Sequence, residues 1–400
     1  MAAAGTDGIL AGTRVLDLTR VLASPFASMI LGDLGAEVLK VELPGSGDEA
    51  RGFGPFLDGE SAYFNSVNRG KKSLTIDLRK PQGQELARRL AGSFDVLVEN
   101  FRPGSMARFG LDYETLHALY PGLVYASISG FGQTGPYAQR PAYDIIIQAM
   151  SGMASITGVE GQPPVRVGSS IADLSAALYS VIGILAALGG ARETGEGQHI
   201  DVSMLDCQVA LLESAIARYD VTGEVPKPLG SRHPTITPFQ FFEAADGYMV
   251  VAAGNDRLWQ RLCETLGIDE LAGDRRFDSN AKRTDNHVEL EPLLAAAFTR
   301  GTVEEWCAKL GEAGVPCGPI LNIAQVVADP QIAAREMIVR VEHPGSLEFA
   351  MPASPLRFSR DPTVEPRPAP GLGSDTEAVL RELLAMDSEE LEALRSQQVI

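Results

Sequence analysis

The sequence contains few of the residues on which metal sites and disulfide scaffolds depend. Its 400 residues include only 4 cysteines, 5 histidines and 2 tryptophans. No H-E-x-x-H or grouped Asp/His pattern occurs, so we expect no metal site. The cysteines have neither metal-ligand spacing nor the density of a disulfide framework. We expect four reduced, buried packing residues: Cys207, Cys263, Cys307 and Cys317.

Positive charge is also scarce. The formal net charge is −18, from 34 Lys plus Arg against 52 Asp plus Glu. This balance disfavours nucleic acid and anionic membrane surfaces as partners. Residues 1–110 contain 13 basic and 13 acidic residues, so the whole excess lies in residues 111–400. We therefore expect an anionic ligand to bind to the N-terminal part.

An export signal and an uninterrupted membrane-spanning run are both missing. The N-terminal stretch MAAAGTDGIL lacks the basic residues and long apolar core of a secretory signal. The most apolar stretch, from Ile171 to Leu188, contains Asp173 and three hydroxyl side chains in an amphipathic helical pattern. We expect a buried helix here, no membrane association, and a cytoplasmic protein.

The first third of the chain alternates between strand and helix patterns. RVLDLT, AEVLKVEL, SLTIDL, DVLVENF and LVYASIS are typical of strands, and SPFASMILGDLG and PQGQELARRLAG of helices. This alternation predicts an α/β, Rossmann-like domain with a mostly parallel sheet covered on both faces. Ligands of such sheets bind at the carboxyl ends of strands. The loops to examine are therefore VELPGSGDEAR, ENFRPGSMAR and ISGFGQTGPY.

Four hundred residues exceed what one hydrophobic core usually supports, so we expect two domains, or one large domain that carries an insertion. The proline-rich stretch TGEVPKPLGSRHPTITP predicts a linker, and a second cluster of prolines spans residues 316–330. We predict a large domain of residues 1–220 and 330–400 and a smaller α+β domain of residues 225–325. The tail PTVEPRPAPGLG, residues 362–373, is expected to lie extended over the surface.

Two motifs allow more than one interpretation. SGFGQTGPY satisfies G-x-G-x-x-G, but Pro136 and Pro141 crowd the place where a dinucleotide-binding helix would begin, which favours a turn that lets a ligand approach. The basic stretch NRGKKSLTIDLRK fits a solvated strand edge or a site for a phosphorylated ligand. Its sequence does not decide between them.

Two further stretches contain candidate site residues. ENFRPGSMARFG places an amide, an aromatic ring and two guanidiniums after a strand, which suits adenine stacking and phosphate or carboxylate recognition. Asp173, in VRVGSSIADLSAALYSVIGILAAL, stands at the threshold of a helix. Taken alone, that position predicts an N-cap.

The ordered motifs together resemble the class III CoA-transferases, the family of formyl-CoA transferase and the CaiB/BaiF proteins. The resemblance rests on GTRVLDLTRVLASPFASMILGDLGAEVLKVELPGSGDEAR, NRGKKSLTIDLRKPQG, DVLVENFRPG, SGFGQTGPY, YDIIIQAMSGM, IADLSAALYSVIGILAAL and GQHIDVSMLD, in that order. It extends from Gly12 to the C-terminal helix. Through GEVPKPLGSRHPTITPFQ and AAGNDRLWQRLCETLG the chain looks most like succinyl-CoA:dicarboxylate transferases, particularly those for glutarate or itaconate.

The resemblance implies a mechanism and a set of site residues. Asp173 matches the family's nucleophile, which forms a mixed anhydride and then an aspartyl-CoA thioester; we expect the helix N-terminus to keep it ionised. Coenzyme A and acyl-CoA are then substrates, with no permanently bound cofactor. Family members are interlocked homodimers whose sites contain residues of both chains. The CoA-contacting positions carry over as Val21, Leu22, Ile76, Arg79, Asn100, Phe101, Arg108 and Tyr143.

The sequence departs from formyl-CoA transferase at two places. Leu43 follows Glu42 where that enzyme has an arginine, and its tetraglycine loop has no counterpart, because GSRHP occupies roughly that region. The arginine that would hold an acceptor's distal carboxylate is left open. The candidates are Arg51, Arg108, Arg166 and Arg232.

Two other functions are considered. An α-methylacyl-CoA racemase of the same fold has a histidine where this chain has Tyr143 and a glutamate near Asn255. Neither replacement is a good proton shuttle at neutral pH. A non-catalytic CoA-binding protein would need Asp173 to act only as a cap.

Overall fold

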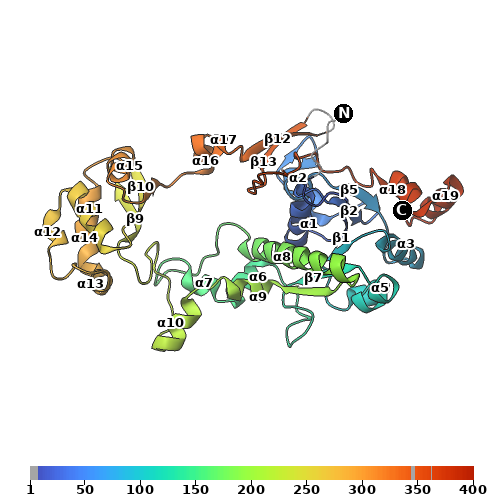
Figure 1. The fold of residues 1–400 in the computed structure, drawn as a ribbon, viewed down its shortest axis with the longest axis horizontal. Coiled ribbons are helices and arrows are strands. Elements are labelled where there is room, and N and C mark those ends of the chain that lie inside the picture. The colour runs from blue at the N-terminus through green and yellow to red at the C-terminus, as the bar shows by residue number, and fades with distance from the viewer. Residues whose placement is uncertain (1–7, 344–346, 362) are drawn as a thin grey trace. The chain divides into compact units, whose positions relative to one another are not determined.

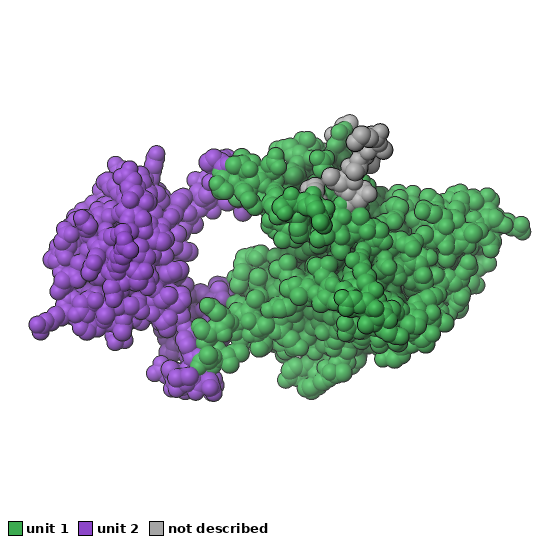
Figure 2. All heavy atoms as spheres, viewed as in Figure 1, with its two compact units in different colours: residues 1–153, 166–217, 331–400 green, residues 154–165, 218–330 purple. Residues whose placement is uncertain are grey.

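The computed structural model describes residues 8–343, 347–361 and 363–400 (Figure 1). They form two compact units (Figure 2). Unit 1 takes its residues from 1–153, 166–217 and 331–400, and unit 2 from 154–165 and 218–330. Pro362, the first residue of the tail expected to lie extended, is outside the described residues, and residues 363–371 contain neither helix nor strand.

Unit 1 is built on a six-stranded sheet with the strand order β5-β2-β1-β6-β7-β8, and every neighbouring pair is parallel. The predicted α/β fold with a mostly parallel sheet is therefore confirmed. The strands are β1 (Arg14–Leu18), β2 (Glu37–Glu42), β5 (Lys72–Thr75), β6 (Val96–Glu99), β7 (Val124–Ser129) and β8 (His199–Ser203).

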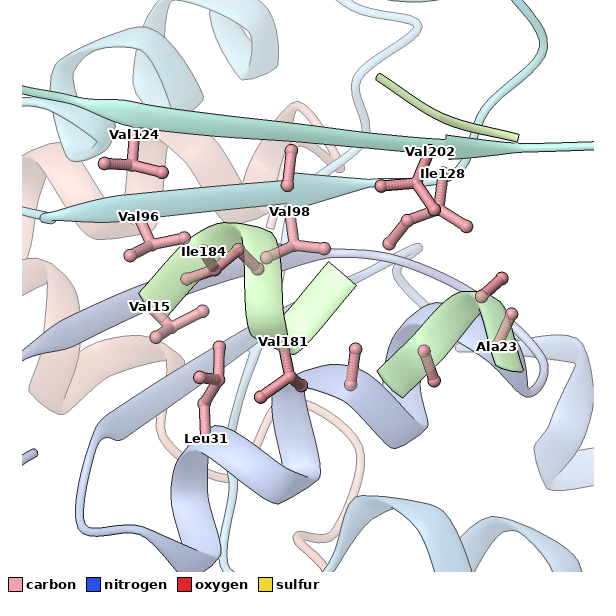
Figure 3. Close-up of a cluster of buried hydrophobic side chains, with 14 of the residues drawn as sticks. Val15, Ala23, Leu31, Val96, Val98, Val124, Ile128, Val181, Ile184 and Val202 are labelled. Atoms are coloured by element: carbon pink, nitrogen blue, oxygen red, sulfur yellow. The ribbon is translucent and has the colours of Figure 1, made fainter. Parts of the chain in front are cut away.

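Alternate side chains of these strands enter two hydrophobic cores, one on each face of the sheet. Val15 of β1 belongs to the first core and Leu16 to the second, as the period of two along a strand requires. Figure 3 shows the first core, where Leu31 and Val181 of two packed helices face the valines of the strands. Both faces are buried, so apolar residues occupy both sets of alternate positions along the strands, interrupted by buried charges such as Asp17 and Lys40.

The helices of unit 1 divide between the two faces. The first core is covered by α1 (Ala23–Asp33), α6 (Asp144–Met150), α8 (Ile171–Thr194) and α9 (Met204–Ala210). The second core is covered by α3 (Pro81–Ala91), α4 (Ser105–Phe109), α5 (Tyr113–Leu119), α18 (Thr376–Leu384) and α19 (Ser388–Ser396). The C-terminal segment thus completes the sheet's second face, although it follows unit 2 in sequence.

Shorter elements complete the sequence of unit 1 and its junctions with unit 2. They are the 3-10 helix η1 (Glu49–Gly52), α2 (Ala62–Asn68), α7 (Met153–Ile156), α10 (Ala215–Thr222), α17 (Pro330–Ala334), and the two-stranded sheets β3 (Phe56–Leu57) with β4 (Glu60–Ser61) and β12 (Ile338–His343) with β13 (Leu347–Pro352).

Unit 2 packs helices on a three-stranded antiparallel sheet of order β11-β10-β9. Its own core includes the buried aromatic residues Trp259, Phe277 and Phe298. The elements are β9 (Phe239–Ala244), β10 (Gly247–Ala252), β11 (Cys317–Pro319), α11 (Asp256–Leu266), α12 (Asp269–Ala272), α13 (Asn280–Asp285), α14 (His287–Phe298), α15 (Val303–Glu312) and α16 (Ile323–Val327).

The structure bears on two expectations from the sequence, which concern the cysteines and the most apolar helix. All four cysteines are free, but only Cys207 and Cys263 are buried; Cys307 and Cys317 are half-buried, so the expectation of buried packing is wrong for them. Helix α8 is the single described helix whose length and composition would allow it to cross a membrane, and half of its most apolar window is buried in the chain.

Candidate active site

The turn between β1 and α1 has an unusual backbone that neighbouring side chains hold in place. Val21 has a φ of 70°, a left-handed conformation that costs a β-branched residue on the order of 1–3 kcal/mol. Its N–H donates to Asp48 Oδ1 at 3.0 Å. On the other side, Arg20 N–H donates to Asn100 Oδ1 at 2.9 Å and Asn100 Nδ2 donates to Arg20 O at 2.8 Å. These bonds fix the turn at the carboxyl end of β1.

Four buried charged residues lie under this turn and are called the buried ion-pair network below: Asp17, Lys40, Asp48 and Lys71. Lys40 Nζ lies 2.8 Å from Asp48 Oδ2, and Lys71 Nζ lies 2.9 Å from Asp17 Oδ2. Lys40 Nζ also donates to Thr19 O at 2.7 Å. Burial by itself would raise the pKa of Asp17, but Lys71, Lys40 and two hydroxyl donors outweigh it and lower the pKa to about 2.

The network also shows what the basic stretch NRGKKSLTIDLRK does. Lys71 is committed to Asp17, and Arg69 is buried against Asp33 Oδ1 with its Nε at 3.1 Å. Neither side chain is solvated or available for a phosphate, so both interpretations are wrong for these two residues. Only Arg79 remains largely exposed while pairing with Asp77 at 2.8 Å.

Asp173 does not cap α8. The helix begins at Ile171 after Ser170, and Asp173 is its third residue. The backbone N–H of Ala172 donates instead to Asp144 Oδ1 at 2.9 Å, and Gln148 Nε2 donates to Asp144 Oδ2 at 2.8 Å. The N-cap interpretation of Asp173 is therefore wrong, because a carboxylate from α6 satisfies the helix end and leaves Asp173 without that bond.

The environment of Asp173 disfavours its charge. Burial raises its pKa, and the nearby Asp144 carboxylate raises it further, to about 7. The expectation that the helix N-terminus keeps Asp173 ionised is wrong in this respect, since desolvation and a like charge dominate. At neutral pH the Asp173 carboxyl is therefore protonated in roughly half of the molecules.

Two neighbours of Asp173 have no signal in the sequence. Asp144 is the first residue of α6, and in the sequence it looks like an ordinary acidic residue in the first turn of a helix. Nothing in the sequence indicates that it accepts a hydrogen bond from Ala172 of α8, which lies 28 positions later. The pKa of Tyr63 rises to about 12 through burial and the charges of Asp173, Asp48 and Asp144, so its phenol belongs to the same group of side chains. No local pattern in the sequence indicates that either residue lies near Asp173.

A cavity of about 320 Å³ contains Asp173 and most of the predicted CoA-contacting residues. It lies at the carboxyl ends of β1, β6 and β7, where the α/β topology predicts ligands to bind. The predicted residues that line it are Val21, Leu22, Asn100, Phe101, Tyr143 and Asp173. Residues far apart in the sequence, such as Val21, Asn100 and Asp173, thus line one cavity.

A second cavity, of about 310 Å³, lies beyond the β1–α1 turn. Its lining includes the predicted residues Ile76, Arg79 and Phe101, together with Leu43, one of the two departures from formyl-CoA transferase. Arg20, Glu49 and Phe101 line both cavities. The two cavities therefore adjoin along this shared wall.

The arginines near the Asp173 cavity are not the ones expected to hold a carboxylate. Arg51 pairs with Glu42 at 2.7 Å and covers the ring of Phe64, and Arg108 donates to Ser105 Oγ at 3.0 Å. Neither lines either cavity, nor do Arg166 and Arg232. Three other arginines line the Asp173 cavity: Arg20, Arg102 and Arg140.

Two features bear on cofactors. The glycines of SGFGQTGPY form a turn, with positive φ at Gly132 and Gly135, and the next helix begins only at Asp144, so they do not open a helix as a dinucleotide fingerprint requires. Among the described residues, no group of three or more His, Cys, Asp or Glu side chains is arranged to hold a metal ion.

Comparison with known proteins points to one family. A family model described as CoA-transferase family III matches residues 10–376. The chain is 41% identical over 392 residues to the succinyl-CoA:glutarate CoA-transferase of Homo sapiens, covering 98% of this chain and 90% of that protein. It is 42% identical over 384 residues to the acetyl-CoA:oxalate CoA-transferase of Acetobacter aceti, covering 96% of each.

A solved structure has a similar fold. The crystal structure of a CAIB/BAIF family protein from Brucella suis is 41% identical and superposes with a TM-score of 0.83, covering 94% of this chain and 99% of that chain.

Proposed function

The chain belongs to CoA-transferase family III, as its ordered motifs predicted, and we propose that it moves CoA from succinyl-CoA to a dicarboxylate such as glutarate or itaconate. One observation carries the mechanism: Asp173 is a half-buried carboxylate in a cavity at the carboxyl edge of the sheet, and it has no ion-pair partner among the described residues. A paired carboxylate such as Asp17 is structural. An unpaired one is available for bond formation.

Asp173 acts as the nucleophile in two exchanges. Its ionised oxygen attacks the thioester carbonyl, the C–S bond breaks, and a mixed anhydride and CoA thiolate result. The thiolate then attacks the aspartyl carbonyl, releasing the donor acid and leaving an aspartyl-CoA thioester from which the acceptor acid takes CoA by the same steps. A carboxylate suits this role because anhydride and thioester lie close in free energy, whereas a serine ester would be too stable.

The ligand extends over both cavities. Residues shared by the two linings support one elongated molecule, with the acyl and pantetheine end against Val21, Leu22, Asn100 and Tyr143. The nucleotide end lies in the second cavity, against Ile76 and Arg79. Phe101 lies between them. Residues 1–110 contribute most of these side chains, which agrees with the absence of excess negative charge there. Arg108 remains a predicted contact of this ligand.

The acceptor is a dicarboxylate whose distal carboxylate binds an arginine of the Asp173 cavity. Arg102 and Arg140 are the candidates. Relatives use glutarate and oxalate, so the distance between the two carboxylates of the acceptor is expected to vary among them.

The active form is an interlocked homodimer in the cytoplasm, without a nucleic-acid or membrane partner. Helix α8 presents an apolar face with Leu178 52% exposed and Ile182 62% exposed. A second copy of the chain would bury this face, and the net charge of −18 disfavours nucleic acid and anionic lipid. Sedimentation should give twice the mass of the chain; an active monomer would contradict this part of the proposal.

Covalent trapping tests the proposed nucleophile. The protein is incubated with succinyl-CoA and then with hydroxylamine or borohydride, and the peptide covering residues 165–188 is analysed by mass spectrometry. We expect a hydroxamate, or the alcohol produced by reduction, at Asp173 and neither in Asp173→Asn. Full CoA transfer by Asp173→Ala would overturn the assignment of the nucleophile. If the wild-type protein bound succinyl-CoA but showed neither CoA transfer nor an adduct, a CoA-binding role would be left.

The same preparation tests the racemase alternative. Asn255 caps α11, since its Oδ1 accepts the N–H of Leu258 at 2.9 Å, and an amide so engaged is a poor proton shuttle. We expect no deuterium to enter the α-carbon of an acyl-CoA in D2O. Incorporation of deuterium at the α-carbon would favour racemisation.

A further inference from the structure

Two serines of the Asp173 cavity have buried hydroxyls without a partner. Ser24 is completely buried and Ser129 is 8% exposed, and neither Oγ forms a hydrogen bond with any part of the chain that the structure describes. Both residues line the cavity that contains Asp173. A buried hydroxyl left unpaired costs about 1–3 kcal/mol, so two in one cavity indicate a ligand group that they bind.

The serines come from different elements that end at the same edge of the sheet. Ser129 is the last residue of β7, and Ser24 is the second residue of α1, which packs against α8 (Figure 3). Most buried serines in this unit are satisfied locally: Ser180 Oγ donates to Ala176 O at 2.6 Å and Ser28 Oγ donates to Asp17 Oδ2 at 2.6 Å. The two unpaired hydroxyls therefore differ from serines in equally buried positions.

The start of α1 adds backbone donors next to Ser24. The residue before the helix is Leu22, which supplies no capping oxygen, and Pro25 occupies the third helical position. The N–H groups of Ala23 and Ser24 have no partner within the helix because the first turn lacks acceptors for them. The helix dipole makes this end favourable for negative charge.

Charge decides which ligand group the subsite takes. Asp144 and Asp173 already place two carboxyls near the cavity, so a free carboxylate in the same place would add a further negative charge. When Asp173 attacks a thioester, its charge moves onto the acyl oxygen and the total charge is unchanged. An acyl oxygen that becomes negative only during reaction fits the site better than a permanent anion.

We propose that the Ser24 and Ser129 hydroxyls, with the first N–H groups of α1, form the oxyanion-binding site for the acyl group that reacts with Asp173. This inference rests on the proposed function. As the C–O bond to Asp173 forms, the carbonyl electron pair moves onto the acyl oxygen, and the hydroxyls and N–H groups donate hydrogen bonds to it without giving up their protons. Collapse of this intermediate re-forms the carbonyl and expels CoA thiolate.

Single-turnover acylation tests the proposal. Succinyl-CoA is mixed with excess enzyme in the absence of an acceptor, and the succinate released is measured by chromatography of quenched samples. Binding is measured separately with the unreactive thioether analogue of succinyl-CoA. We expect Ser24→Ala and Ser129→Ala each to slow succinate release about 10- to 1,000-fold while affinity for the thioether changes by less than about 3-fold. Ser180→Ala, an equally buried but satisfied serine, should retain the wild-type rate.

Several outcomes would overturn the proposal. Wild-type acylation rates in both variants would do so, and so would a loss of thioether affinity as large as the loss of rate, because that would mean ground-state binding only. If Ser24→Ala fails to fold, Ser129→Ala decides alone. Failure of the proposed function is distinct, since the wild-type protein itself would then release no succinate and form no adduct at Asp173.

Discussion

The buried ion-pair network and the Asp173 cavity lie close together in unit 1, yet they shift the pKa of a carboxyl in opposite directions. Asp17 is fully buried beside Lys71, and the pKa of its carboxyl is lowered to about 2. Asp173 is half-buried beside Asp144, and the pKa of its carboxyl is raised to about 7. Burial raises both pKa values; the sign of the neighbouring charge makes the difference.

The contrast separates a structural role from a chemical one. The network is neutral overall and satisfied, and through Asp48 it holds Val21 in its left-handed conformation. Its charged groups are paired with one another and stabilise the β1–α1 turn. Asp173 has no such partner among the described residues, so its charge remains available for attack on a carbonyl carbon.

The largest expected effect comes from breaking the network. Asp17→Asn leaves Lys71 buried without a counter-charge and should lower the free energy of unfolding by about 3–5 kcal/mol at pH 7. Urea unfolding at fixed protein concentration measures this change. Adding Lys71→Met should recover part of the loss, since the unpaired charge is then removed.

Two results would count against this view of the network. One is unchanged stability in Asp17→Asn, and the other is a double variant less stable than the single. If Asp17→Asn does not fold, recovery of a folded protein on adding Lys71→Met supports the pairing by itself.

Substitution of Asp173 is expected to change the free energy of unfolding by less than Asp17→Asn does, and in the opposite direction. Its pKa is raised in the folded state, so the folded protein loses stability as pH rises from the unfolded value near 4 through about 7. Asp173→Asn should therefore increase the free energy of unfolding at pH 8, by at most about 4 kcal/mol, and the gain should disappear near pH 4. The exposed Asp285→Asn should show no comparable change.

Urea unfolding at several pH values would measure this gain. The effect of Asp17→Asn should show the reverse dependence. Its loss is present at neutral pH and shrinks as pH falls towards 2, because the folded-state pKa of Asp17 is low. Parallel pH profiles for the two variants would remove the contrast between the sites.

The smallest effect concerns the pair of acids. Asp144→Asn keeps an oxygen for the N–H of Ala172 but removes the charge that raises the pKa of Asp173. Since only ionised Asp173 attacks, kcat/KM should fall as pH decreases through about 7, and the variant should shift this fall to lower pH by roughly half a unit to one unit.

Asp112→Asn is the matched control for this shift. Asp112 also accepts a backbone N–H at a helix start, from Thr115 at 3.0 Å, but does not contribute to the pKa of Asp173. Its profile should match that of the wild-type protein. A shift of the Asp144→Asn profile to higher pH would contradict this prediction. It would show that the amide acts by disturbing the start of α8 and not by removing the negative charge of Asp144.

Much of the fold could be predicted from local pattern. β1, β2, β6 and β7 are apolar runs with turns at both ends, and a run buried on both faces keeps this signature in any parallel sheet. The cap of α8 could not be predicted in this way. Asp173 has the residue type of a cap, but Asp144, from another helix, occupies the bonding position.

The side chains of the site likewise include some that motifs predict and some that have no signal in the sequence. Val21, Leu22, Asn100, Phe101 and Tyr143 were carried over by motif, and the structure brings them to one cavity with Asp173. Ser24 and Ser129 carry no motif signal, because an unpaired serine is indistinguishable in sequence from a satisfied one such as Ser180.

Periodicity and motif order, which act between near neighbours in the chain, were enough to assign this protein an α/β sheet and a place in its family. The protonation of Asp173, the burial of Lys71 against Asp17 and the unpaired state of two hydroxyls were decided only by folding. The reason is that desolvation and Coulomb forces act through space, between groups whose separation along the chain says nothing about their distance.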